Sequence, residues 1–111
     1  MTIDDRDIVI VLTNLPDRAA ATQLAVLLVE HRYAACVNIL AECTSVYRWE
    51  GEIRMTTEVP LLIKTSAAAY PRLEERIRAN HPYELPEILN IPVSGGLPAY
   101  LDWVATESGA G

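Results

Sequence analysis

The sequence predicts a single α+β domain in which an antiparallel sheet is covered by two helices. Three observations support this: a continuous apolar run at residues 8–12, two segments with apolar residues at helical spacing, and an alternating stretch over residues 34–65. Half of the 111 residues are hydrophobic, which is enough to build a core without disulfides. No linker or repeat interrupts the chain, so residues 1–111 are expected to form one domain, with 1–6 and 107–111 as flexible tails.

The first strand and helix come early in the chain. Ile8–Leu12 is apolar at every position, which is typical of a central strand buried on both faces. Pro16 is expected at the first helical position, with Asp17 close to the positive end of the helix dipole. The helix is expected to end near His31-Arg32, and its inward residues follow at helical spacing: Ala20, Leu24, Leu27 and Leu28.

Residues 34–65 predict a long β-hairpin whose two arms meet at Glu50-Gly51, because the odd positions carry most of the apolar side chains in both arms. Straight arms of about fifteen residues would span on the order of 50 Å, whereas a compact chain of this length has a radius of gyration of only ~13 Å. The hairpin must therefore bend or project, and its apolar face then needs cover, most simply from further copies of the chain. Tyr47 and Trp49 near the tip are expected to pack on a neighbouring subunit, and a stacking platform for a ligand is the alternative.

The register of this hairpin needs a correction somewhere along its length. A two-residue turn at Glu50-Gly51 would pair odd positions with even ones and place apolar residues opposite polar ones. Either the loop has an odd number of residues or a β-bulge resets the pairing. We predict a bulge in the arms, with Pro60 as a candidate position because it cannot donate to the ladder.

The remaining elements complete a familiar topology. A second helix is expected from a Ser66 cap to about Asn80, with Pro71 either in its first turn or marking a later start. A strand at 88–93 and a short helix opening at Pro98 follow. The order β-α-β-β-α-β is the split βαβ, or ferredoxin-like, arrangement, which places both main helices on one sheet face and leaves the other open.

Net charge and cysteine spacing limit the classes of partner and the cellular compartment that we expect for this protein. A net charge of −6 with scattered basic residues argues against a nucleic-acid partner. No secretory signal and no apolar segment of about 20 residues is present, so we expect no membrane partner and a cytoplasmic location. Cys36 and Cys43 would lie roughly 23 Å apart on a straight strand and on opposite faces, which excludes a disulfide and indicates thiols in a reducing compartment.

No catalytic motif is present, and the chain is not expected to be an enzyme. The densest polar group is His81, Tyr83, Glu84 and Glu87, between two prolines. Imidazole with carboxylates suits a divalent ion, for which the affinity series favours copper(II). The alternative is a helix-end histidine among solvated acids. His31 is expected to complement a helix dipole instead of binding metal.

Several segments together carry a family resemblance. The chain resembles the CutA divalent-cation tolerance family in these segments: 35–39 (ACVNI), 45–51 (SVYRWEG), 62–65 (LIKT), 81–84 (HPYE), 86–88 (PEI) and 91–93 (IPV). The resemblance implies a homotrimer of ferredoxin-like subunits, a shape related to PII-like signalling proteins and a role in divalent-metal tolerance. It also implies metal binding through His81, with Cys36 as a softer additional ligand. A further cysteine of the family near the second helix is absent here, where Asn80 precedes His81.

Three functional hypotheses follow from these observations. The first is a cytoplasmic trimer that binds copper(II) or a similar ion through His81, aided by Glu84 or Glu87. The alternative is a PII-like sensor that holds a small anion or metabolite in an inter-subunit cleft with Lys64, Tyr83, Glu84 and Glu87; a scaffold without a ligand is a third reading. Lys64 separates the first two, because an ammonium group repels a metal ion and attracts an anion.

Overall fold

The computed structural model describes residues 4–109. Its elements follow the expected order and confirm the ferredoxin-like α+β fold. Their bounds are β1 (Ile8–Leu15), α1 (Arg18–Glu30), β2 (Cys36–Ile39), β3 (Cys43–Trp49), β4 (Glu52–Ser66), α2 (Tyr70–Asn80), β5 (Leu89–Pro92) and α3 (Pro98–Glu107). The strands form an antiparallel sheet in the order β2-β4-β1-β5, and β3 pairs with the outer part of β4.

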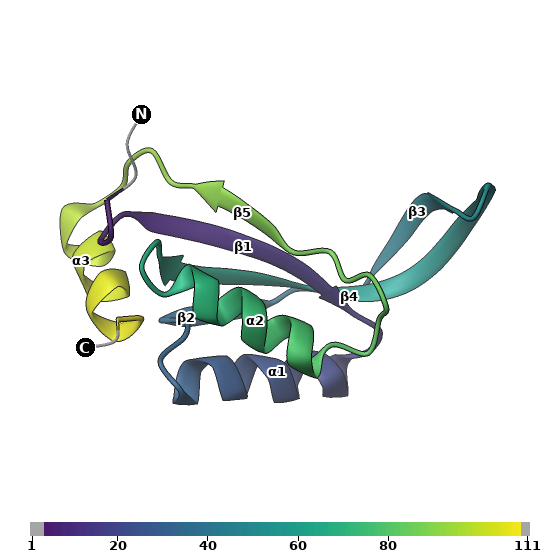
Figure 1. Ribbon diagram of the computed structural model, residues 1–111, viewed down its shortest axis with the longest axis horizontal. Helices are drawn as coiled ribbons and strands as arrows, with labels where there is room; N and C mark the ends of the chain where they lie inside the picture. The colour runs from purple at the N-terminus through teal and green to yellow at the C-terminus, as the bar shows by residue number, and fades with distance from the viewer. Residues whose placement is uncertain (1–3, 110–111) are drawn as a thin grey trace.

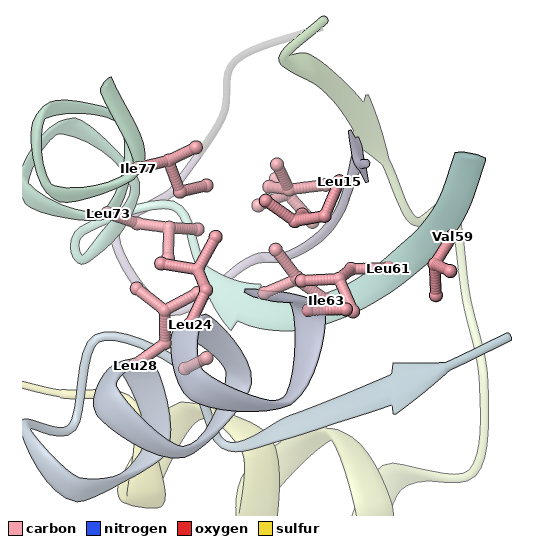
Figure 2. Packing of buried hydrophobic residues seen from close by; sticks show 12 residues of the cluster. Leu15, Leu24, Leu28, Val59, Leu61, Ile63, Leu73 and Ile77 are labelled. Carbon is pink, nitrogen blue, oxygen red and sulfur yellow. The ribbon is translucent and has the colours of Figure 1, made fainter. Parts of the chain in front are cut away.

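Helices α1 and α2 lie side by side on one face of the sheet, as Figure 1 shows. The core fills the space between these two layers. Figure 2 shows Leu24 and Leu28 from α1 and Leu73 and Ile77 from α2 directed toward the sheet residues. The sheet contributes alternate residues of its two central strands: Val9, Val11, Leu15, Val59, Leu61 and Ile63.

The opposite face of the sheet is apolar but has no helix over its centre. Cross-strand pairs place Leu62, Leu12 and Leu89 in one row, and Ile10 and Ile91 in the next. We call these five residues the open-face patch. Leu89 and Ile91 at the sheet edge are 52% and 43% exposed.

Both main helices begin differently from the sequence-based expectation. Pro16 is not the first helical residue: Asp17 is the N-cap, and its carboxylate accepts a hydrogen bond from the Ala20 amide at 2.8 Å. The second helix does not start at Ser66. The Ser66 hydroxyl instead caps a turn, where it accepts a hydrogen bond from the Ala69 amide at 3.3 Å. Helix α2 begins at Tyr70 with Pro71 in its first turn, which is the later of the two starts that the sequence allowed.

The hairpin confirms the predicted bulge at the expected place. A two-residue turn joins Trp49 to Glu52, with φ of 51° at Glu50 and 79° at Gly51. Between the pairs Ile39–Leu61 and Cys43–Glu58, the first arm has three residues, 40–42, opposite only two, 59 and 60. The extra residue lies opposite Pro60 and splits the first arm into β2 and β3. Odd positions therefore pair with odd ones between β2 and β4, and with even ones in the outer part between β3 and β4.

The bulge also changes which side chains share a face. In the outer part of the hairpin, Tyr47 and Trp49 pair with Arg54 and Glu52, so they face away from the apolar side chains of β4. Ile53 and Met55 share the opposite face with Val46, and these three are exposed by 69%, 71% and 63%. The expectation of a single apolar hairpin face was therefore wrong for this part. Figure 1 shows the outer hairpin projecting from the sheet, and the radius of gyration is 14.5 Å.

Helix α3 covers one end of the open sheet face, where Val104 and Ala105 pack on Ile8 and Ala35. Some residues of the segments expected as flexible tails contact the rest of the domain. Glu107 ends α3 and pairs with Arg32 at 3.3 Å, and Ser108 is buried and donates to the Val104 carbonyl. Asp5 and Asp7 carbonyls accept hydrogen bonds from the turn after β4. Residues 1–3 and 110–111 of the expected tails lie outside the described residues.

Candidate functional site

A polar cluster forms where β1 ends and the loop after α2 crosses it. It consists of Asn14 on β1, Glu58 on β4, and His81, Tyr83 and Glu87 from the loop, and we call it the strand-end cluster. The two prolines at 82 and 86 prevent α2 from continuing, so the chain turns back along the end of β1. The loop thereby brings three of its predicted site residues beside strands that are distant in sequence.

His81 is fixed through both ring nitrogens. Its Nδ1 accepts a hydrogen bond from the Tyr83 amide at 3.1 Å, and its Nε2 lies 2.6 Å from the Asn14 carbonyl oxygen. Because Nδ1 acts as acceptor, the neutral ring carries its proton on Nε2, which donates to Asn14. Asn14 in turn donates from its side-chain amide to the Glu87 carboxylate at 3.3 Å. The histidine therefore ties the loop to the end of β1.

Tyr83 and Glu58 form the buried part of the cluster. The Tyr83 ring packs on His81 with 4.7 Å between ring centroids, and its hydroxyl is buried without a hydrogen-bond partner among residues 4–109. Glu58 is also buried. Burial, and then the nearby negative charge of Glu58, raise the pKa of Tyr83 to about 12. The hydroxyl therefore stays protonated and neutral at physiological pH, as a donor directed toward a carboxylate.

The side chains of one chain do not fit a metal centre as they stand. Within residues 4–109, no group of three or more His, Cys, Asp or Glu side chains is placed to hold an ion. Both nitrogens of His81 are engaged, and Glu87 accepts from Asn14. An ion at His81 would have to displace one of these hydrogen bonds, so the predicted ligand roles of His81, Glu84, Glu87 and Cys36 stay predictions.

The two cysteines lie differently from the sequence-based expectation. Cys36 pairs with Lys64 and Cys43 pairs with Glu58, and both β4 partners are even-numbered residues of one uninterrupted strand. The bulge between the cysteines thus places them on the same side of the hairpin, and the expectation of opposite faces was wrong. They remain about 20 Å apart, because their partners Lys64 and Glu58 lie six positions apart on β4. Both are free thiols.

Lys64 lies apart from the other residues of the predicted anion cleft. It pairs with Ile10 on β1, whereas Tyr83 lies near Asn14, four residues further along the same strand, which corresponds to about 13 Å. The Lys64 ammonium lies 6.0 Å from the centre of the Tyr100 ring on α3. One chain therefore does not bring Lys64 together with Tyr83, Glu84 and Glu87.

Three residues of these sites were missed by the sequence-based prediction. Asn14 and Glu58 join His81 and Tyr83 only through the fold, since 67 residues separate Asn14 from His81. Glu58 looked like an ordinary outward residue of an alternating strand, and its only signal was its place beside the bulge at Pro60. Tyr100 lies in the short helix expected to open at Pro98, and nothing in its local sequence indicates contact with Lys64.

The fold and this geometry define a small ferredoxin-like α+β protein with a polar cluster at the end of its first strand and a projecting hairpin. The sequence model of the family described as CutA1 divalent ion tolerance protein matches residues 9–107. The chain therefore belongs to the CutA1 divalent ion tolerance family.

Individual relatives support this assignment. The divalent-cation tolerance protein CutA of Thermus thermophilus is 46% identical over 100 residues, covering 90% of this chain and 97% of the relative. The chloroplastic protein CutA of Arabidopsis thaliana is 40% identical over 96 residues, but this chain spans only 53% of its length.

Solved structures agree in fold. The structure of the Thermus thermophilus protein has a TM-score of 0.90 at 45% identity and covers 92% of this chain and 99% of its own. The apo structure described as the PII-like protein CutA from Nostoc has a TM-score of 0.85 at 42% identity, covering 91% and 97%. Within residues 4–109, no helix is both long and apolar enough to span a membrane.

Proposed function

We propose that the protein acts in divalent-cation tolerance as a non-enzymatic homotrimer in the cytoplasm. The open-face patch carries this proposal. It presents apolar side chains from three adjacent strands, including Leu89 and Ile91, on a sheet face that no helix of the same chain covers at its centre. A contiguous apolar surface of this kind marks an association site. The family membership and the PII-like description of the Nostoc relative support an oligomer, and three copies is the number that the resemblance to the CutA family implies.

The hairpin is the second element proposed to contact neighbouring copies. Tyr47 and Trp49 were expected to provide this contact. The Tyr47 hydroxyl bonds to Thr56 of its own hairpin at 2.7 Å, and Trp49 is half-buried. We propose that both faces of the projecting hairpin take part, with Val46, Ile53 and Met55 on the side opposite these aromatic residues.

A matched pair of variants tests the assembly. Leu89→Glu places a charge in the open-face patch, whereas Val26→Glu places the same charge at a 51% exposed position on α1, in the helix layer. We expect Leu89→Glu to reduce the mass measured by light scattering below that of three 12.3 kDa chains. Val26→Glu should leave the mass unchanged. An unchanged mass for Leu89→Glu would contradict the role of this face.

Copper(II) is the ion to test for the tolerance function, in line with the ion-affinity series. Titration calorimetry of the wild type and His81→Ala distinguishes the roles of His81. If His81 is a ligand, removing the imidazole should weaken copper binding by more than about tenfold, since even the loss of a residue that only orients a metal ligand costs roughly that much. Equal affinities would show that His81 only ties the loop to β1. Glu84→Gln, at an exposed position of the same loop, serves as the comparison for the acidic side chains.

A second candidate function is sensing of a small anion, and one observation favours it. Lys64 lines a pocket at the end of the open sheet face, where its ammonium lies against Tyr100. The predicted cleft with Tyr83, Glu84 and Glu87 would require side chains from two copies, because Lys64 and Tyr83 lie apart within one chain. Thermal-shift measurements with anions on the wild type and Lys64→Ala test this candidate.

A further inference from the structure

We propose that the pocket beside α3 binds an organic anion with an apolar body, and that Lys64 holds the anionic group. This inference deepens the second candidate function: it keeps Lys64, replaces the other residues of the predicted cleft, and names the class of ligand.

The pocket has the size and walls of a small-molecule site. Its volume is about 380 Å³, within the range of roughly 300–1,000 Å³ typical of ligand pockets. One wall is the sheet, with Ile8 and Ile10 from β1 and Lys64 from β4; the other is the segment after β5 and the start of α3, with Val93, Leu97 and Tyr100. These walls are almost entirely apolar, so the body of a ligand must be apolar as well.

Lys64 is the one charged side chain among the lining residues. It is also the only lysine in the sequence, in a chain where acidic residues outnumber basic ones by 15 to 9. The ion pairs formed within residues 4–109 involve arginines and do not include Lys64. An ammonium group beside apolar walls without a carboxylate partner gains from a bound anion, because its lost hydration is then replaced by a charge-assisted hydrogen bond.

The strand fixes the backbone of Lys64, and its ammonium group lies near one aromatic ring. The Lys64 backbone lies in the centre of the sheet, paired with Cys36 on one side and Ile10 on the other. Its charge lies 6.0 Å from the Tyr100 ring centre, at the outer limit of a cation–π contact. A single cation at the end of an apolar pocket matches a monocarboxylate on an aliphatic or aromatic body. It does not match a metal ion, which it repels, or a polyphosphate, which needs several cations.

The single lysine permits a direct test on the full-length assembled protein. Selective ¹³C labelling of lysine gives one side-chain NMR signal, that of Lys64. We expect octanoate to shift this signal in a saturable way, and octylammonium, which has the same alkyl chain with the opposite charge, to leave it unchanged. No shift with octanoate, or equal shifts with both compounds, would overturn the proposal.

Equilibrium dialysis with radiolabelled octanoate extends the test to variants. Lys64→Met should weaken binding about tenfold or more, because it removes the charged partner of the carboxylate, while Lys64→Arg should largely retain binding. Gly96→Leu should also abolish binding with Lys64 intact, because a side chain at Gly96 starts 3.4 Å from Leu101 and extends along the pocket wall. Arg72→Met removes an exposed positive charge from α2 and should have no effect. Unchanged octanoate binding by Lys64→Met would contradict the role of the ammonium.

A neighbouring copy is the competing occupant of the pocket. In that case octanoate would not shift the Lys64 signal in the assembled protein but would shift it in Leu89→Glu, the variant expected to dissociate, and this result would overturn the proposal. The outcome is separate from the assembly test, because octanoate binding can be found or absent whatever the measured mass of the protein.

Discussion

At the scale of single residues, the strand-end cluster depends on hydrogen bonds that no local pattern predicts. His81 was singled out because it lies in the densest polar segment of the sequence, and its loop neighbours Tyr83 and Glu87 are near it in the structure. Its decisive partner is the Asn14 carbonyl, a backbone group 67 residues away that any residue type could supply. The chemistry of the imidazole was therefore predictable from the sequence, but its engagement on both nitrogens was not, because that depends on where the loop crosses β1.

The ionisation of Tyr83 gives a test at this scale. Its folded pKa is raised from 10.0 to about 12, so the folded protein binds this proton more tightly than the unfolded chain. The resulting contribution to stability is complete below pH 10 and is lost as the pH rises through 12. Absorbance titration of the wild type minus Tyr83→Phe should show one tyrosine ionising near pH 12. A difference titration centred near pH 10 would show that this hydroxyl is not buried beside Glu58.

At the scale of elements, the hairpin shows how far pattern and register arguments reach. Alternation located the hairpin and its turn at Glu50-Gly51, and the mismatch between odd and even positions required a bulge, which lies opposite Pro60. The same argument could not assign faces beyond the bulge, because one inserted residue reverses every later side chain of that arm. Cys43, Tyr47 and Trp49 are the residues whose faces were affected.

The turn itself gives a prediction about stability. Gly51 has a φ of 79°, and an added Cβ meets no atom within 4 Å, so Gly51→Ala should be destabilising through backbone strain alone. We expect a loss of about 1–2 kcal/mol in the free energy of unfolding, measured by urea denaturation at a fixed protein concentration. Gly95→Ala is the control, because that glycine also has open space and its φ lies outside the strained positive range. Equal effects of the two substitutions would argue against the strained turn.

At the scale of the whole molecule, one chain leaves an apolar sheet face and its hairpin uncovered. The helices cover one sheet face, the open-face patch remains exposed, and the hairpin extends away from its own core, as Figure 1 shows. The expectation of a partner came from the sequence, because the predicted hairpin was too long to fold within a compact single chain. The distance between Lys64 and Tyr83 could not be predicted from the sequence. Lys64 on β4 and Tyr83 in the loop after α2 both lie beside β1, and only the strand register fixes how far apart they are.

Native mass spectrometry of the wild-type protein at low micromolar concentration tests the central claim most directly. A homotrimer built through the open-face patch and the hairpin predicts a dominant species of three 12.3 kDa chains that persists on dilution. A dominant species of one chain would contradict the assembly and, with it, the proposed trimeric function.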